Sequence, residues 1–283
     1  MRELKTEAEC RLLYADVVNG YSAVQDFFIK HYSEADLSYT EFIRCKFEEE
    51  GRKEGLLCEK DQLLLLQEKD NWSKQEEVQY QEAKTNLDQL KFSLKKLIIP
   101  QQINHMKGMI EKEEKEFNEK FQVRRQLLGM TLEQYANKRA AENHILRAFF
   151  KDINLTIPRF SEEQIDDLSN QSMDIYIDIY HQTHSAFYEK NFKRIAVCPF
   201  FLNGYSLSEE NPFIFFGKPI VSLTLYQISL FSKGRYYQNI LSEPEAKHPP
   251  EEYYEDLDSV VKFYDQQYSI ILGKRTNNQL MRA

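Results

Sequence analysis

Four side chains that can bind metals recur at helical spacing in the second half of the chain: Asp174, Asp178, His181 and His184. Steps of four, three and three residues place them on one face of a helix. Carboxylate and imidazole groups are zinc ligands, so the pattern would suit a metal-dependent hydrolase. One helix face supplies no complete ligand set, however, and a solvated face explains the spacing more simply. We therefore expect no metal, no cofactor and no catalytic residue.

The cysteines and glycines also give no sign of an enzyme. Cysteines stand at positions 10, 45, 58 and 198 without paired spacing, which predicts reduced thiols in an intracellular protein and mostly buried small side chains. The sequences typical of phosphate loops, dinucleotide-binding turns, serine nucleophiles and zinc proteases are absent, and the nine glycines are dispersed along the chain. We therefore expect a protein that acts by binding.

Composition limits the choice of partners. The 283 residues are 42% hydrophobic and carry a net charge of −8, which predicts a folded core and disfavours nucleic acid as a partner. The first ten residues, MRELKTEAEC, do not form the apolar segment of a signal peptide. The most apolar stretch, 213–231, is interrupted by Lys218 and Pro219, so no membrane span is expected.

The distribution of proline predicts a mainly α fold. No proline precedes Pro100, and seven follow from position 158 onward. Because proline breaks helix interiors, residues 1–155 should be helical almost throughout, and 195–255 should be irregular and rich in aromatic residues. We expect N-terminal helices over 1–40, a helical hairpin over 41–130, a C-terminal body over 131–273 and a flexible tail over 274–283. Within the body, 162–193 should form one helix, while 195–198 and 213–216 fit short strands.

The hairpin is predicted from a heptad pattern on both sides of Pro100. Apolar residues alternate steps of three and four, which is the pattern of a coiled-coil seam. The seam residues are Tyr80, Ala83, Leu87, Leu90, Leu94 and Leu97 before the proline, and Ile103, Met106, Ile110 and Phe117 after it. A turn near 98–102 would make the two helices antiparallel and bring Leu90 near Ile110 and Ala83 near Phe117. Such a protruding arm would present Leu87, Leu90, Leu94, Met106 and Ile110 to a partner.

A second candidate binding surface lies near the C-terminus. Residues 243–265 contain eight acidic residues and two lysines, interleaved with aromatic side chains. Aromatic residues are enriched in protein interfaces, so Tyr253, Tyr254, Asp256, Asp258 and Phe263 are candidate contacts. The alternative is that this acidic segment only keeps the C-terminal region soluble.

Two stretches resemble a group of proteins encoded among the structural and tail genes of large tailed bacteriophages. The first is the arm followed by Met130-Thr131-Leu132-Glu133. The second runs from Leu223-Thr224 and Gln227 through Tyr236-Tyr237, an E-P-E sequence at 243–245 and an acidic cluster to Phe263. The similarity covers about residues 40–268 and depends on order and spacing. Phe231 and Phe263 stand where the group has tryptophan.

The resemblance implies a non-enzymatic tail-assembly, chaperone-like or structural protein, in the host cytoplasm or the virion. Its partners would be other phage structural or tail proteins, with self-association as a further option and with no nucleic acid or membrane. The alternatives are a cellular coiled-coil adaptor and, from a different class, an all-helical metal-dependent hydrolase.

Overall fold

The computed structural model describes residues 2–97, 100–244 and 246–280. Helices account for 71% of the chain and accompany a small three-stranded antiparallel sheet, so the prediction of a mainly α protein is confirmed. The chain divides into a first unit, Met1–Glu41 with Ala141–Ala283, and a second unit, Phe42–Ala140. Within the described ranges, no helix combines the length and the apolar content that crossing a membrane requires.

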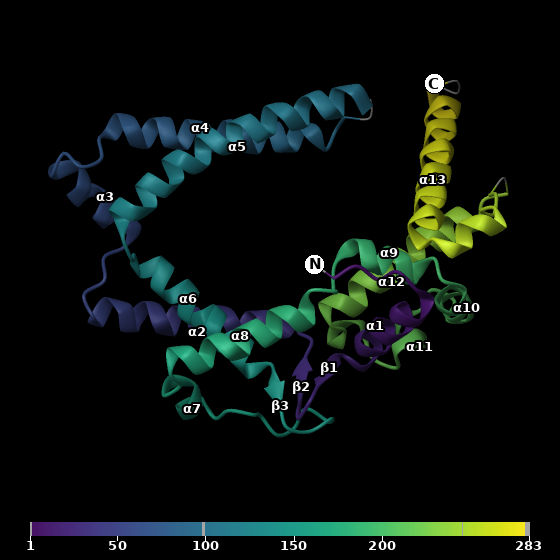
Figure 1. Ribbon diagram of the computed structural model, residues 1–283, viewed down its shortest axis with the longest axis horizontal. Coiled ribbons are helices and arrows are strands. Elements are labelled where there is room, and N and C mark those ends of the chain that lie inside the picture. Colours follow the sequence, from purple (N-terminus) through teal and green to yellow (C-terminus); the bar gives the residue numbers. More distant parts are fainter. Residues whose placement is uncertain (1, 98–99, 245, 281–283) are drawn as a thin grey trace. The chain divides into compact units, whose positions relative to one another are not determined.

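The first unit contains most of the helices and all three strands (Figure 1). In chain order its elements are α1 (Glu7–Asn19), β1 (Tyr21–Val24), β2 (Phe27–Lys30), β3 (Phe149–Phe150), α7 (Glu162–Asp166), α8 (Asn170–His184), α9 (Glu189–Ala196), α10 (Pro199–Leu207), α11 (Pro212–Phe216), the 3₁₀ helix η1 (Ile220–Ser222), α12 (Leu225–Leu241), the 3₁₀ helix η2 (Glu251–Glu255) and α13 (Leu257–Leu280). The start of α2 (Glu34–Lys53) and the end of α6 (Leu132–Arg147) also belong to this unit.

The sheet corrects the prediction that residues 1–155 are helical almost throughout. Helix α1 ends at Gly20, which adopts the left-handed conformation, and the chain then forms the β1–β2 hairpin. In β2, Phe27 and Ile29 are buried while their neighbours are half-buried, which is the period of two that characterises a strand. Phe149 of β3 pairs with Ile29 of β2, and the helix before it ends at Arg147.

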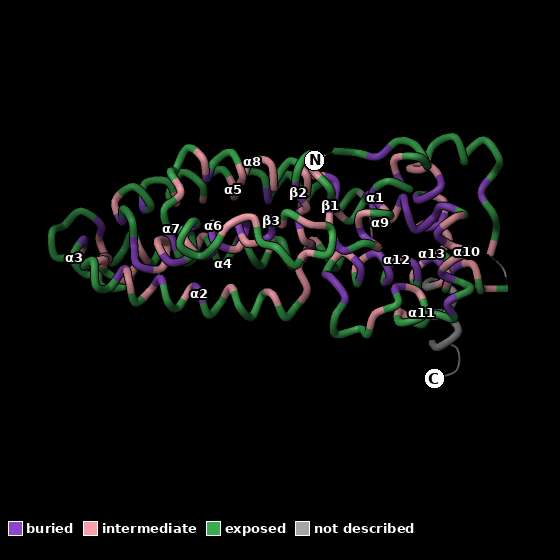
Figure 2. Tube along the Cα trace, turned by 90° about the horizontal axis from the view of Figure 1, so that it is seen from below, coloured by how far each residue is buried: buried purple, intermediate pink, exposed green. Residues whose placement is uncertain are grey.

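The main core of the first unit lies among α1, α9, α10, α12 and α13, where buried residues concentrate (Figure 2). Leu230, Tyr237 and Ile240 of α12 are at most 1% exposed. Gly234 sits in the middle of the same helix because the Tyr205 ring occupies the space beside it. A Cβ atom at Gly234 would lie 2.6 Å from Cδ2 of that ring. The aromatic residues of the C-terminal half therefore build a packed core.

Several elements differ from the boundaries expected. The single helix predicted over 162–193 is three helices, because Ser169 caps a new start for α8 and α9 begins after Tyr188. The two candidate strands, 195–198 and 213–216, are the end of α9 with the turn that follows it, and α11. The stretch 199–207, expected to be irregular, is the helix α10, and α13 continues to Leu280, where a flexible tail was expected. Residues 281–283 lie outside the described residues.

A buried arginine joins α9 to the start of α13. Arg194 is 3% exposed and binds the Asp258 carboxylate through two hydrogen bonds, from Nε to Oδ1 at 2.7 Å and from Nη2 to Oδ2 at 2.8 Å. Its Nη1 donates to Asn191 Oδ1, and Asn191 in turn binds backbone groups of Arg2, Leu4 and Ala186. Hydrogen bonds from Arg194 lower the pKa of Asp258 to about 2.

Two histidines are enclosed by aromatic rings between β2, α8 and α12. His31 is 1% exposed, and its ring lies 4.7 Å from Phe187, 5.2 Å from Tyr226 and 5.7 Å from His184, centroid to centroid. Burial, with a contribution from His184, lowers the pKa of His31 to about 3. Burial also lowers the pKa of His184 and of His144. These imidazoles are therefore neutral in the folded protein at pH 7.

Acidification below pH 6.5 should destabilise the first unit before its carboxylates titrate. In the unfolded chain His31 binds a proton near pH 6.5, whereas the folded protein resists this until about pH 3. The contribution of neutral His31 to the free energy of unfolding is complete above pH 6.5. It decreases as the pH falls, by about 1.4 kcal/mol per pH unit for one histidine. Urea unfolding monitored by far-UV circular dichroism at pH 7 and pH 5 measures the loss. The variant His31→Gln should lose less stability between pH 7 and pH 5 than the wild type. The exposed His248→Gln should lose as much as the wild type. Equal stability of the wild type at both pH values would contradict the account.

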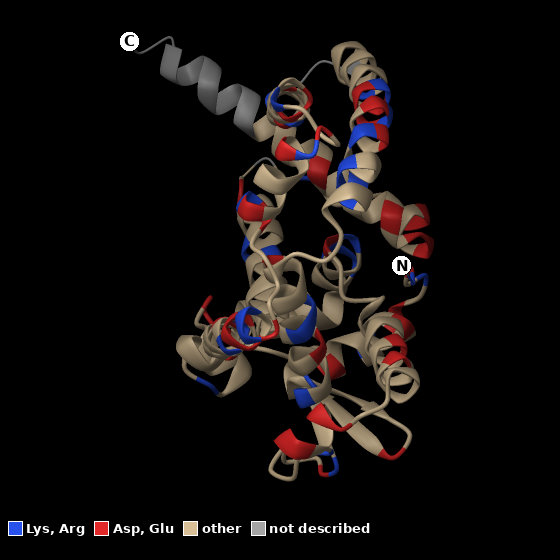
Figure 3. Cartoon of the chain, turned by 90° about the vertical axis from the view of Figure 1, so that its left-hand side faces the viewer, with Lys and Arg blue, Asp and Glu red and all other residues tan. Residues whose placement is uncertain are grey.

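The second unit is all helical in its described residues. Its elements are α2 (Glu34–Lys53), α3 (Glu59–Glu68), α4 (Lys74–Leu94), α5 (Pro100–Leu128) and α6 (Leu132–Arg147). A small core of Ile43, Phe47, Ala136 and Ala140 joins α2 to α6. Basic and acidic residues intersperse along these helices, so neither sign of charge dominates their surface (Figure 3).

Candidate functional site: the α4–α5 helix pair

Local sequence signals start and orient α4. Ser73 accepts a hydrogen bond from the Glu76 backbone N–H, and the Glu76 carboxylate accepts one from the Ser73 backbone N–H. This capping box satisfies two amides that the first helical turn leaves unpaired. Helix α4 ends at Leu94 and α5 begins at Pro100, so the predicted turn is bounded, although residues 98 and 99 lie outside the described residues.

Helices α4 and α5 pack as an antiparallel pair. Lys91 Nζ lies 2.6 Å from Glu114 Oε1, and Arg124 near the end of α5 binds Glu77 near the start of α4. Along both helices the half-buried or buried positions follow the heptad pattern. They are Tyr80, Ala83, Leu87, Leu90, Leu94 and Leu97 on the first side, and Ile103, Met106, Ile110, Glu113 and Phe117 on the second.

The polar contacts across the pair fit the expected register, in which Leu90 lies near Ile110: Asn86 Nδ2 donates to Glu113 Oε2 at 3.4 Å. Within this register the Phe117 ring stacks on Tyr80, one turn along α4 from Ala83, with centroids 5.3 Å apart. Leu87 and Ile110 are the most buried positions farther along the pair, at 6% and 7% exposure. The side chains at the seam thus stabilise the pair itself.

An ion cluster fastens α3, α4 and α5 together at one end of the pair. Arg124 is 6% exposed and donates to both Glu77 oxygens, at 2.8 and 3.0 Å, and to Glu59 Oε1 at 2.8 Å. Trp72 Nε1 donates to the same Glu77 carboxylate at 3.0 Å. The guanidinium also lies 4.7 Å from the centre of the Tyr80 ring. Burial opposes the charge of Glu77, but the bond from Arg124 keeps its pKa below the usual range.

Apolar side chains cover the other side of this cluster. Leu66, Trp72, Tyr80 and Leu128 are each at most 8% exposed and form one contact group with half-buried residues of α3 and α5. Polar and apolar contacts together therefore hold the end of the pair in place, and we call this set of residues, with Arg124, Glu77 and Glu59, the root cluster.

Apolar side chains that the seam does not use remain exposed on both helices. Val78 and Phe92 of α4 are 54% and 59% exposed, and Met109 and Val123 of α5 are 43% and 51% exposed. Val78, Thr85 and Phe92 are spaced by seven residues, so they share one face of α4. That face is away from the seam, since the seam residues occupy other heptad positions.

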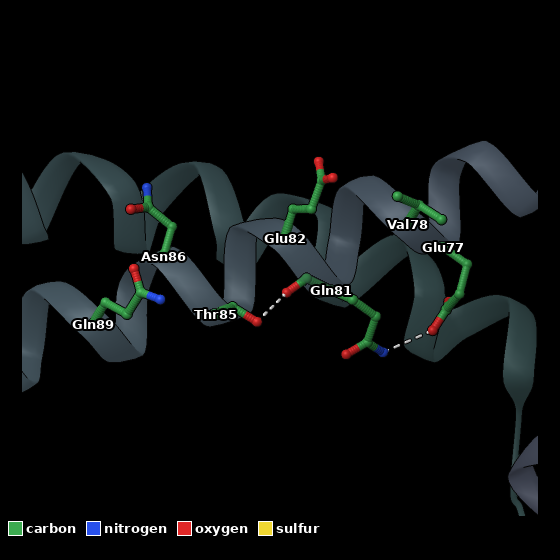
Figure 4. Close-up of a pocket in the computed structure, with 7 residues that line it drawn as sticks. All are labelled: Glu77, Val78, Gln81, Glu82, Thr85, Asn86 and Gln89. Atoms are coloured by element: carbon green, nitrogen blue, oxygen red, sulfur yellow. Dashed lines mark hydrogen bonds between the residues drawn. The ribbon is translucent and has the colours of Figure 1, made fainter.

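A shallow groove of about 420 Å³ runs along this outer face of α4 (Figure 4). Its lining residues all come from α4, and most are uncharged: Glu77, Val78, Gln81, Glu82, Thr85, Asn86 and Gln89. The Gln81 amide donates to Glu77, and the Thr85 hydroxyl donates to the Gln81 backbone carbonyl. A similar groove on α5 is lined mainly by charged side chains, among them Glu111, Glu114, Lys115 and Glu119.

The residues proposed from the sequence as arm contacts lie at the seam. Leu87 and Ile110 are buried there, and Leu90, Leu94 and Met106 are half-buried. The heptad pattern correctly identified the residues that pack between the two helices. Because they are buried or half-buried in that packing, they present little surface to a partner. The exposed candidates, Val78 and Phe92, were missed, although their seven-residue spacing is visible in the sequence.

The C-terminal candidates divide between exposed and structural residues. Tyr253 and Tyr254 of η2 are 36% and 47% exposed. Asp256 accepts hydrogen bonds from Ser259 at the start of α13, and Asp258 is bound to Arg194 and Lys190. Phe263 is half-buried, with its ring 6.2 Å from that of Tyr253. Tyr253, Tyr254 and Asp256 are therefore the members of this set that are exposed to solvent.

The residues whose spacing suggested a metal site do not come together to form one in the structure. Asp174, Asp178 and His181 are exposed, whereas His184 is stacked on Tyr180 with centroids 4.0 Å apart. In the part of the chain that the structure describes, no three His, Cys, Asp or Glu side chains come together in a way that could hold a metal ion. The solvated-face interpretation fits three of these residues and is wrong for His184.

Comparisons with family models, with curated proteins and with solved structures give no match for this chain.

Proposed function

We propose that the chain is a non-enzymatic protein-binding component of tailed-phage assembly or virion structure, and that the α4–α5 pair is its binding arm. The observation that carries this proposal is the exposed apolar face of α4, whose Val78 and Phe92 contribute nothing to the seam. The phage context comes from the resemblance in sequence. The partners proposed are other structural or tail proteins, in the host cytoplasm or the virion.

The outer face of α4 suits a partner helix. Val78 and Phe92 are fourteen residues apart, about 21 Å along the axis. A helix lying along the groove would meet apolar anchors near both ends and uncharged polar groups between them. Such helix-in-groove contacts use apolar side chains at helical spacing. The charged groove on α5 costs more to desolvate, which favours α4 as the contact face.

The main alternative occupant of the outer face of α4 is a second copy of this chain. The same apolar face would serve a cellular coiled-coil adaptor, so the surface alone does not separate the two settings. A metal-dependent hydrolase has no support from the geometry, since its candidate ligands are not gathered around a common centre in the described residues.

Charge placed on the α4 face should abolish partner binding without unfolding the pair. Val78→Glu with Phe92→Glu leaves the seam and the root cluster unchanged, and should weaken co-purification with tail proteins from infected cells at least tenfold, as expected for loss of an interface centre. The matched control is Met109→Glu with Val123→Glu, which places the same charges on exposed apolar positions of α5. Equal binding by wild type and the α4 variant, or equal loss in both variants, would refute the assignment to α4.

A further inference from the structure

Two of the four cysteines come together in the main core of the first unit. Cys10 of α1 is 0% exposed, and Cys198, the N-cap residue of α10, is 1% exposed. Both belong to the group of contacting buried residues that forms this core. By contrast, Cys45 of α2 is exposed and Cys58 before α3 is half-buried, and both lie in the second unit. Cys10 and Cys198 thus form a pair that their distance in the sequence conceals.

Aromatic contacts next to this pair hold α1 against the start of α10. The Tyr14 ring meets the rings of Phe200 and Phe201, with centroids 5.4 and 5.9 Å apart. Tyr14 follows Cys10 by one helical turn, so both project from the same face of α1. Phe200 and Phe201 lie in the first turn of α10, which begins after Cys198. The same packing therefore brings Cys10 to Cys198.

The two thiols form a hydrogen bond with each other. Cys198 Sγ also donates to the Arg194 carbonyl oxygen at 3.2 Å. The bond with Cys198 lowers the pKa of the Cys10 thiol although burial opposes this, and the positive charge of Arg194 lowers it further. The same bond, together with burial, raises the pKa of Cys198. Because the thiolate is the reactive form, Cys10 is the sulfur that reacts first.

We propose that oxidation by a peroxide joins Cys10 to Cys198 in a disulfide bond between α1 and the start of α10. The Cys10 thiolate attacks one oxygen of hydrogen peroxide, breaks the O–O bond and becomes a sulfenic acid, while the other oxygen leaves as hydroxide. The Cys198 sulfur then attacks the sulfenic sulfur, forms the S–S bond and expels the hydroxyl group. The protons of the two thiols convert both hydroxides into water, and two electrons pass from the sulfur atoms to the peroxide.

The disulfide bond ties the N-terminal helix to the C-terminal half of the chain. It closes a loop that runs from α1 to α10 and contains the sheet and the whole second unit. A cross-link that closes a long loop stabilises a protein chiefly by restricting the unfolded chain. Such a bond stays reduced in the cytosol and persists in oxidising surroundings. The oxidised protein therefore resists unfolding more strongly than the reduced one.

Peptide mapping of the folded full chain tests whether the bond forms. The chain carries Cys45→Ser and Cys58→Ser, so that Cys10 and Cys198 are its remaining thiols. Far-UV circular dichroism checks that it is folded before hydrogen peroxide is added. After alkylation without a reducing agent, mass spectrometry should find the two cysteine peptides joined within a monomer, and dithiothreitol should separate them. Separate peptides that carry thiols, sulfinic acids or sulfonic acids, or a bond between two chains, would overturn the proposal.

Urea unfolding followed by far-UV circular dichroism tests the consequence of the bond. The oxidised chain should unfold at a higher urea concentration than the reduced chain, and dithiothreitol should cancel the shift. Cys10→Ala in the same background cannot form the bond, so peroxide should leave its unfolding midpoint unchanged. Cys198→Ala is the matched second variant and should behave in the same way. A peroxide-induced shift in these variants as large as that of the parent chain, or no shift in the cross-linked chain, would contradict the inference.

Discussion

Replacing Arg124 by methionine is expected to lower the unfolding free energy of the second unit by about 3–5 kcal/mol. The change removes both bonds to Glu77 and the bond to Glu59, and it leaves the Glu77 carboxylate beside the buried Trp72 and Tyr80 without its cation. A buried charge that loses its partner costs more than the pair contributed, because the remaining ion stays desolvated.

The single tryptophan makes this loss directly measurable. Trp72 is 5% exposed, belongs to the root cluster and donates to Glu77, so its emission reports on the second unit. Urea unfolding followed at this residue should shift to lower denaturant in Arg124→Met. The neighbouring Arg125 is exposed, and Arg125→Met should stay within about 0.5 kcal/mol of wild type. If Arg124→Met and Arg125→Met unfold at the same urea concentration, the root cluster does not stabilise the α4–α5 pair.

Replacing Arg194 by methionine should destabilise the first unit by a similar amount, about 3–5 kcal/mol. Arg194 is 3% exposed, and its loss removes both of its hydrogen bonds to Asp258 and one of the two that Asn191 Oδ1 accepts. The unit has no tryptophan, so far-UV circular dichroism or hydrogen exchange of α9 and α13 is the readout.

Lys190 provides the matched control because it binds the same carboxylate. Its Nζ lies 3.0 Å from Asp258 Oδ2, but the lysine side chain is 46% exposed. Exposed ion pairs contribute about 0–1 kcal/mol, so Lys190→Met should have a small effect. If Lys190→Met lowers the free energy of unfolding as much as Arg194→Met does, neutralising the charge of Asp258 is what stabilises the unit, and the buried position of Arg194 is not.

Local periodicity predicted the helix pair well. Heptad steps state which residues face a neighbouring helix, and the burial of Tyr80, Leu87 and Ile110 follows them. They do not state the axial offset between the two helices. The position of the turn near Pro100 predicts that offset, and the Asn86–Glu113 and Glu77–Arg124 contacts fit it. The choice of ring partners within it was not predicted, since Phe117 stacks on Tyr80 and not beside Ala83.

Elements that depend on distant partners were not predictable from the sequence. The β1–β2 strands are four residues each, and their apolar residues also fit helical spacing, so pairing with β3 decides their state. Arg124 and Glu77 are separated by 47 residues, and Arg194 and Asp258 by 64. A single sequence does not reveal which charges meet at such distances.

A truncated chain tests the central claim, that the α4–α5 pair binds the partner, most directly. Removing residues 86–112 and joining the ends through a short Gly-Ser turn deletes Phe92 and the far part of the seam, and keeps Trp72, Glu77, Tyr80 and Arg124 of the root cluster. Circular dichroism and Trp72 emission report folding, and co-purification with phage tail proteins reports binding. We predict a folded protein that no longer co-purifies with them. A truncated protein that folds and still binds would move the interaction to the acidic segment 243–265 and contradict the account, and one that unfolds would show that the pair is part of the core.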